Sequence, residues 1–481
     1  QYDRLYGASK DLSFNSLWYN LNGGAIESLS SNFSQWTMMS YVGRINYGLM
    51  DRYLLTASLR YDGSSRLSEG NKWALFPSAA IAWRITEEDF AKNLDWLSNL
   101  KLRFSYGQAG NTNSVSPYAS EGTISGSVYY PFGTSTSVGN LPANIANPML
   151  TWERTSEYNV GLDFGFLNQR ISGNIEYYNR TTNDLLMKRN IPVHLGYSSV
   201  TSNVGSVRNS GFELQLNTAN IMTKNFAWNT TINLAYNKNE IVSLADEEDL
   251  SNYSIHLQGM RGRYSDKRFI GKPVDTNWTQ NTIGVWQLGE EEEAAKYGCV
   301  PGNFKIKDYN NDGKLTDDDY IIDGKRTPDW TGGMTNMFKI YDFDFSFHMY
   351  FQAGATQYDR FFENFALEWN SQNFNNLRTN YWTPENPSNT MGRPSQMGSR
   401  GNIAYERTDF LKVSYITLGY TLNKRLMSKW GLDNARIYVT VQNPFILTKF
   451  RGLDPEQPDL TNIGDTDGMT MNALLGVNIS F

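Results

Sequence analysis

Apolar and polar residues alternate one by one along many segments of this chain, which is the pattern of strands with two different faces. In one segment Trp228, Thr230, Ile232, Leu234 and Tyr236 share a face, and their neighbours are mostly Asn and Thr. The pattern predicts an all-β chain with about fourteen such segments. They lie at residues 34–47, 52–62, 73–85, 100–109, 155–166, 170–179, 184–190, 207–218, 226–237, 270–286, 331–340, 343–354, 410–422 and 435–443, with a final one at 472–481.

Many of these segments are about ten residues long, whereas ordinary strands have ~5–6 residues and a tilted strand across a bilayer needs ~9–11. The connections are uneven. The clearly alternating segments 155–166 and 170–179 are separated only by Leu167, Asn168 and Gln169, but four other connections are very long. The long connections are 110–150, 238–269, 287–330 and 355–409. Short turns on one side and long loops on the other are typical of outer-membrane barrels. We therefore predict a transmembrane antiparallel β-barrel, with 355–409 as a long extracellular loop.

Composition excludes several other classes of protein. The chain has 481 residues and a net charge of −6, which argues against a nucleic-acid partner. No apolar run approaches the ~18 residues of a transmembrane helix. Three His and one Cys leave little for zinc or histidine-based catalysis. No nucleophile elbow, phosphate-binding loop or dinucleotide-binding glycine pattern stands out, so we predict that the chain is not an enzyme.

Residues 308–319 (DYNNDGKLTDDD), within the long loop 287–330, have the spacing of an EF-hand loop. The candidate ligands of Ca²⁺ or Mg²⁺ are Asp308, Asn310, Asp312, the backbone carbonyl of Lys314, and Asp319. Asp at the last position reaches less far than the usual Glu. The alternative is a turn rich in Asn, Asp and Gly with solvated charges. A bound cation would stiffen the loop and would have no catalytic role.

Five aromatic residues lie in or beside the long connections and are candidates for substrate binding. They are Trp278, Trp286, Trp369, Tyr381 and Trp382. Flat aromatic faces suit sugar rings, and neighbouring Asn, Gln, Asp and Arg residues suit hydroxyls or peptide groups. The alternative for each is packing within the loops or a place in an aromatic girdle at the membrane interface.

Eight motifs, collinear over nearly the whole chain, resemble those of the SusC-like (RagA-type) TonB-dependent outer-membrane transporters of Bacteroidetes. They lie at 60–66 (RYDGSSR), 73–78 (WALFPS), 100–111 (LKLRFSYGQAGN), 152–155 (WERT), 203–213 (NVGSVRNSGFE), 327–333 (TPDWTGG), 440–445 (TVQNPF) and 452–456 (GLDPE), and the chain closes on Phe481. Each motif is weak alone, but the ordered series is specific.

The resemblance implies a multi-pass barrel of about 22 strands in the cell outer membrane, in contact with lipid and lipopolysaccharide, with a plug domain inside it. It also implies a TonB-box at the periplasmic face and a SusD-like surface lipoprotein that acts as a lid. The family imports glycans, and in some members peptides, using the proton-motive force through TonB. Whether this chain serves an oligosaccharide or a peptide stays open at this point.

The sequence departs from the family pattern because it has no plug domain, no TonB-box and only about fourteen strands. We therefore expect it to be the C-terminal part of a barrel, mature, processed or truncated, since it starts at Gln1. An open sheet would leave two unpaired edges in lipid, so we expect another chain to carry the plug and the early strands. The alternatives are a smaller self-closed barrel, acting as a passive porin or structural protein, and a soluble glycan-binding or hydrolytic β-protein.

Overall fold

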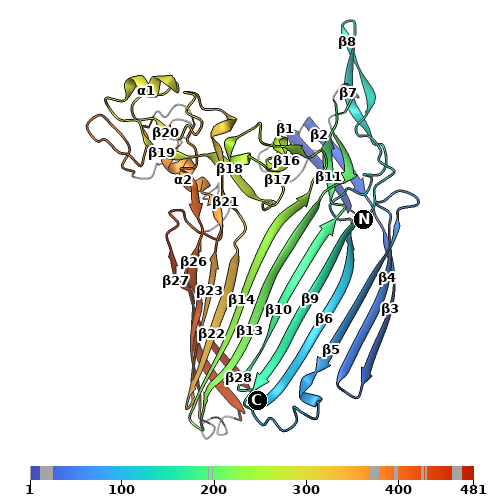
Figure 1. Cartoon of the computed structure of the whole chain (residues 1–481), viewed down its shortest axis with the longest axis vertical. Coiled ribbons are helices and arrows are strands. Elements are labelled where there is room, and N and C mark those ends of the chain that lie inside the picture. Colours follow the sequence, from blue (N-terminus) through green and yellow to red (C-terminus); the bar gives the residue numbers. More distant parts are fainter. Residues whose placement is uncertain are drawn as a thin grey trace.

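Thirteen antiparallel strands form one large sheet, and the chain runs through them in sequence order (Figure 1). The strands are β3 Met38–Leu49, β4 Tyr53–Ser64, β5 Trp73–Arg84, β6 Leu97–Asn111, β9 Glu153–Phe166, β10 Ile171–Asn183, β13 Ser206–Met222, β14 Phe226–Ser243, β22 Trp330–Ile340, β23 Phe343–Ala353, β26 Phe410–Thr421, β27 Asn434–Thr448 and β28 Asn472–Ser480. This computed structural model describes residues 2–10, 25–192, 194, 196–197, 199–367, 379–394, 399–423, 427, 431–457 and 469–481.

One face of the sheet is apolar and open to the surroundings. Leu55, Ile81, Phe104 and Val160 lie directly opposite one another on four neighbouring strands, so they share this face. Each of the four is 43–55% exposed. Soluble monomers rarely expose so large a continuous apolar surface, whereas a membrane barrel turns such a band towards lipid.

Aromatic pairs border this apolar band at both ends. Tyr236 packs against Trp330 at the end with the long connections, with the rings tilted by 49° and their centroids 4.9 Å apart. Trp228 stacks on Phe338 near the short turns, with centroids 5.6 Å apart. Tyr236 and Trp228 lie on the same strand, about 26 Å apart along it at the usual rise. This spacing matches that of the interfacial aromatic girdles of an outer-membrane barrel, whose apolar band is about 25 Å tall.

The long connections fold into small elements at one end of the sheet, and the short turns and the C-terminus lie at the other end (Figure 1). The small elements are β7 Ile124–Phe132, β8 Ser135–Pro142, β11 Leu186–Asn190, β12 Ser199–Asn203, β15 Glu248–Asp249, β16 Arg261–Arg263, β17 Arg268–Phe269, β18 Thr276–Gln280, β19 Thr282–Val285, α1 Glu291–Lys296, β20 Phe304–Ile306, β21 Tyr320–Lys325, β24 Thr356–Tyr358, α2 Arg360–Phe362 and β25 Tyr405–Arg407. The strands β1 Tyr2–Lys10 and β2 Ala25–Ser34 pair with each other.

The all-β, antiparallel architecture is confirmed, and thirteen of the predicted segments correspond to strands of the large sheet. Two predicted segments contain strands that lie outside the large sheet. Within residues 184–190 the strand is β11, which pairs with β12 in a separate two-stranded sheet. Residues 270–286 divide into β18 and β19, which pair with β21 and β20 inside the folded connections. In the part of the chain described, no helix is both long and apolar enough to cross a membrane.

Candidate functional site

The second face of the large sheet is polar and carries ion pairs that join neighbouring strands. Arg103 on β6 donates to Asp163 on β9 and to Glu176 on β10, in each case over 2.7 Å. Arg180 and Glu157 pair over 2.7 Å between β10 and β9. Arg103, Asp163 and Glu176 are only partly exposed, whereas Arg180 is exposed, and together they give this face a charged lining. A wall of this kind presents hydrogen-bonding groups to a polar solute.

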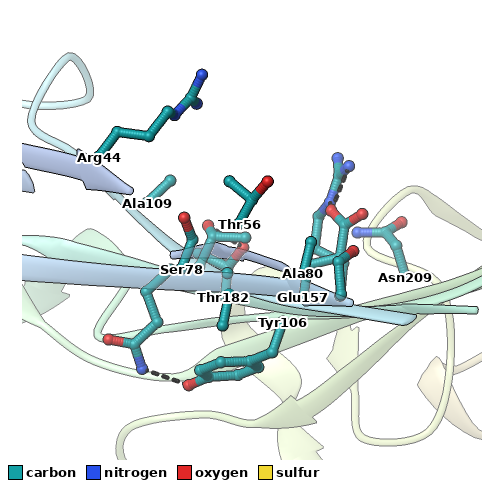
Figure 2. Close-up of a pocket in the computed structure, with 15 residues that line it drawn as sticks. Arg44, Thr56, Ser78, Ala80, Tyr106, Ala109, Glu157, Thr182 and Asn209 are labelled. Atoms are coloured by element: carbon teal, nitrogen blue, oxygen red, sulfur yellow. Dashed lines mark hydrogen bonds and ion pairs between the residues drawn. The ribbon is translucent and has the colours of Figure 1, made fainter. Parts of the chain in front are cut away.

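A groove of about 730 Å³ runs over this polar face (Figure 2). It exists because several strands place small residues at adjacent positions. Those residues are Ser78, Ala80, Ser105, Gly107 and Ala109. In Figure 2 the side chains of Arg44, Glu157 and Asn209 lie on one side of the strands, and the Tyr106 ring lies on the other. This view reproduces the alternation of the sequence: polar groups line the groove, and the aromatic ring belongs to the apolar face.

A second groove of about 380 Å³ lies farther along the same face, over β10, β13, β14, β22 and β23. Glu213, Gln215 and Asn233 line it, together with His348, whose Nδ1 lies 2.9 Å from the Thr335 hydroxyl. The two grooves contain amides, hydroxyls and charges of both signs. Sequence reasoning noted the alternation but missed these residues as a site. The signal was available in the polar half of each alternating segment, where charged residues recur.

The structure buries two of the five predicted substrate-binding aromatics. Trp286 is 5% exposed and packs with Ala294 and Cys299, and Trp382 is 5% exposed in a separate apolar cluster. The indole N–H of Trp382 donates to Gln287 Oε1 over 3.0 Å. Both residues therefore hold the folded connections together, and neither ring face is available to a ligand in this conformation.

The other three aromatics have different positions. Trp278 is partly buried, packs against Phe269 and Tyr320, and lines a cavity with cationic side chains. Tyr381 is partly exposed, and its backbone carbonyl accepts a hydrogen bond from Asn386. Trp369 lies outside the described residues. A substrate contact for any of the five stays a prediction.

The EF-hand-like segment is a turn whose two buried carboxylates, Asp308 and Asp319, bond to backbone N–H groups. Asp308 accepts from Asn311 N at 2.6 Å and from Gly313 N at 3.0 Å. Asp319 is fully buried and accepts from Tyr309 N at 2.8 Å and from Thr316 N at 2.9 Å.

The remaining predicted metal ligands are positioned by the same turn. Asn310 accepts from Asp312 N, and Asp312 accepts from Lys314 N. Among the described residues, no group of three or more His, Cys, Asp or Glu is placed to hold a metal ion. Burial opposes ionisation of Asp308, but hydrogen bonds from Gly313 and Tyr297 outweigh it and lower its pKa. Binding of Ca²⁺ or Mg²⁺ to this segment stays a prediction.

Comparison with known proteins agrees with this architecture. Residues 1–331 match the family described as TonB dependent receptor-like, beta-barrel. The TonB-dependent receptor SusC of Bacteroides thetaiotaomicron is 35% identical over 457 residues, which cover 92% of this chain and 44% of SusC. The TonB-dependent receptor P26 of Formosa agariphila is 33% identical over 471 residues, which cover 94% of this chain and 47% of that receptor. The chain spans about half the length of these curated relatives.

Solved structures show the same fold. The RagAB peptide importer in its open-open state superposes with a TM-score of 0.81 at 24% identity, over 100% of this chain and 51% of the other. The RagAB peptide transporter gives a TM-score of 0.78 at 24% identity, over 94% of this chain and 49% of the other. Together with the apolar outer band, the aromatic girdles and the polar inner face, these matches show that the chain is an outer-membrane β-barrel protein that belongs to the TonB-dependent receptor family.

Proposed function

We propose that this chain forms barrel wall and extracellular loops of a TonB-dependent importer that takes up a polar oligomer, an oligosaccharide or a peptide. The observation that carries the proposal is the two-faced sheet: an apolar band for lipid and lipopolysaccharide outside, and grooves of about 730 and 380 Å³ on the polar face inside. Those grooves offer amides, hydroxyls and charged groups to a polar solute. No enzymatic activity is assigned, because the relatives are named as receptors.

The partners follow from the same proposal. Strands β3 and β28 are the two edges of the sheet, and an unpaired edge is costly in lipid. Further strands and a plug that contacts TonB, from this protein or a separate chain, would close the barrel. The folded connections, including 287–330 and 355–409, would face the cell exterior. They would dock a SusD-like lipoprotein lid, as the likeness to SusC supports.

Uptake measurements test the proposal. Cells that express the protein are given fluorescently labelled neutral and acidic oligosaccharides and peptides, with and without an uncoupler and with and without TonB. We expect uptake of one class that is lost when either the proton-motive force or TonB is removed. Uptake that continues in the uncoupled cells would instead identify a passive porin. In parallel, mass spectrometry of the detergent-extracted complex should reveal a lipoprotein partner.

A further inference from the structure

A cavity of about 430 Å³ lies among the folded connections, apart from the grooves of the sheet. Residues from different connections meet there. Lys267 precedes β17, Trp278 lies on β18, Arg326 follows β21, and Arg360 and Tyr405 lie on α2 and β25. Two long connections of the large sheet, β14–β22 and β23–β26, thus contribute to one cavity, so the cavity depends on their packing against each other.

The cavity lining is cationic, although the protein as a whole is acidic. Lys267, Arg326 and Arg360 line it, and no Asp or Glu is among its described lining residues, whereas the full chain has a net charge of −6. Lys267 and Arg326 form no ion pair with their side chains in the part of the chain that the structure describes. Three nearby carboxylates are hydrogen-bonded. Asp323 accepts from Asn402 Nδ2 at 2.8 Å, and Asp275 accepts from Thr327 N at 2.6 Å. Glu363 accepts from the hydroxyl of the lining residue Tyr358.

Lys267 is the most constrained of the three cations. Its Nζ lies 3.2 Å from the centroid of the Tyr264 ring, which is buried. Partial burial of the ammonium group lowers its pKa, and the Asp317 carboxylate acts in the opposite direction. Burial of this cation outweighs the attraction of Asp317, and a bound anion would offset the remaining cost.

The remaining lining suits a ring-bearing ligand. Trp278, Tyr358 and Tyr405 place aromatic rings around the cations, and the rings of Tyr358 and Tyr405 meet edge to face at 5.0 Å. Asn277 is held in place because its side-chain amide donates to the carbonyls of Asp323 at 3.1 Å and Thr356 at 2.8 Å. Aromatic faces bind the apolar faces of pyranose rings, and Arg and Lys bind carboxylate or sulfate oxygens.

We propose that this cavity binds the carboxylate or sulfate group of an acidic oligosaccharide, with Arg326 and Lys267 as the charged contacts and Trp278 beside the sugar ring. The inference rests on the proposed function, since it names the class of oligomer to be imported. An acidic sugar is favoured over a peptide carboxylate because three aromatic rings accompany the cations in a single cavity.

The test measures binding to the full protein in detergent by isothermal titration and by tryptophan fluorescence. The probes are an oligogalacturonate and its methyl-esterified neutral form, a sulfated oligogalactan and its desulfated form, and an acidic peptide. The variants are Arg326→Gln and Lys267→Gln. The control is Lys296→Gln on α1, whose side chain pairs with Glu293 away from the cavity. Arg326→Gln should fold normally, because its side chain has no described partner to lose.

We expect at least one acidic sugar to bind tenfold or more tightly than its neutral form, and Arg326→Gln and Lys267→Gln to remove that difference. Lys296→Gln should leave it unchanged. Preference for the carboxylate or for the sulfate distinguishes the two sources of charge. Equal affinity for charged and neutral sugars, unchanged binding by Arg326→Gln, or binding of the acidic peptide alone would overturn the inference. The proposed import function is tested separately by the uptake experiment in cells. Uptake that does not depend on TonB would contradict import, whatever the binding experiment shows.

Discussion

Arg103 on β6 reaches across the polar face of the sheet and donates from Nε and Nη2 to the carboxylate of Asp163 on β9, with distances of 2.7–3.1 Å. The same guanidinium also bonds to Glu176 on β10. One cation thus holds two carboxylates and links three strands. Forked contacts of this kind are stronger than simple ion pairs because both their geometry and their charge are matched.

Arg103→Met should therefore destabilise the barrel by about 1 to 3 kcal/mol, because Glu176 loses its cation and Asp163 keeps only its ion pair with Lys101. Urea unfolding of the detergent-solubilised protein, followed by tryptophan fluorescence, measures this change. Arg180→Met is the matched control, since Arg180 has a single pair with Glu157 and is 51% exposed. The control should cost less than about 1 kcal/mol. If both variants lose the same free energy of unfolding, the contact between Arg103 and Glu176 adds nothing to stability.

Trp382 provides a prediction about the folded connections. Trp382→Phe keeps an aromatic ring but removes the hydrogen bond to Gln287, so it should destabilise this region by about 1 kcal/mol. Trp382→Ala should cost about 3 to 5 kcal/mol, because it empties a buried position. Hydrogen exchange in the paired strands β19 and β20 measures both changes. If Trp382→Phe instead weakens ligand binding and leaves hydrogen exchange unchanged, the indole ring contacts the substrate directly.

Gly302 supports the same packing and offers an independent variant. Its φ is +90°, and a Cβ atom at this position would lie 2.4 Å from the Trp382 ring. Gly302→Ala should therefore open the Trp382 cluster as Trp382→Ala does, and hydrogen exchange should rise in the same peptides. Gly298→Ala is the control, because its φ is also positive but no atom lies within 4 Å of the added Cβ.

The strands of the large sheet could be predicted from the sequence because their two faces meet different surroundings. Lipid on one side and a polar interior on the other force alternation, as in Leu100, Lys101, Leu102 and Arg103. Residues 270–286 show where this reasoning fails. Asn281 separates two short strands there, and each pairs with a distant segment of the folded connections. Local alternation cannot identify such partners.

The candidate site was only partly predictable for a similar reason. Trp286 and Trp278 have the same chemistry, but the first is buried against α1 and the second lines a cavity. The difference depends on tertiary contacts that the sequence does not reveal. Likewise, Lys267 and Arg326 are separated by a long stretch of chain, and only the folded structure brings them to one cavity.

Asp359 should make the segment around α2 sensitive to pH. It is fully buried, its Oδ1 accepts from Phe362 N at 2.9 Å, and burial raises its pKa to about 6, with Glu406 adding to the effect and Arg451 opposing it. The folded segment therefore retains its proton between about pH 4 and 6, where the unfolded chain releases it. Its stability should fall as pH rises through this window and level off above it.

Hydrogen exchange of residues 359–367 at pH 5 and pH 7.5, corrected for intrinsic rates, measures this effect. Protection should be greater at pH 5. Asp359→Asn keeps an oxygen that can accept from Phe362 N but cannot ionise, so the variant should show the same protection at both values. If Asp359→Asn shows the same pH dependence of protection as the native protein, the effect arises from another group.

The turn at residues 308–319 allows the cation prediction to be separated from its structural role. Asp308 accepts hydrogen bonds from two backbone N–H groups and from the Tyr297 hydroxyl, so Asp308→Asn should lower the free energy of unfolding by about 1 to 3 kcal/mol even in EDTA. If the turn also binds Ca²⁺, millimolar Ca²⁺ should raise the Tm of the native protein and have little effect on Asp308→Asn or Asp312→Asn. Asp249→Asn, in another loop, is the control. A native protein whose Tm is the same in EDTA and in Ca²⁺ would contradict the metal prediction and leave the turn with a purely structural role.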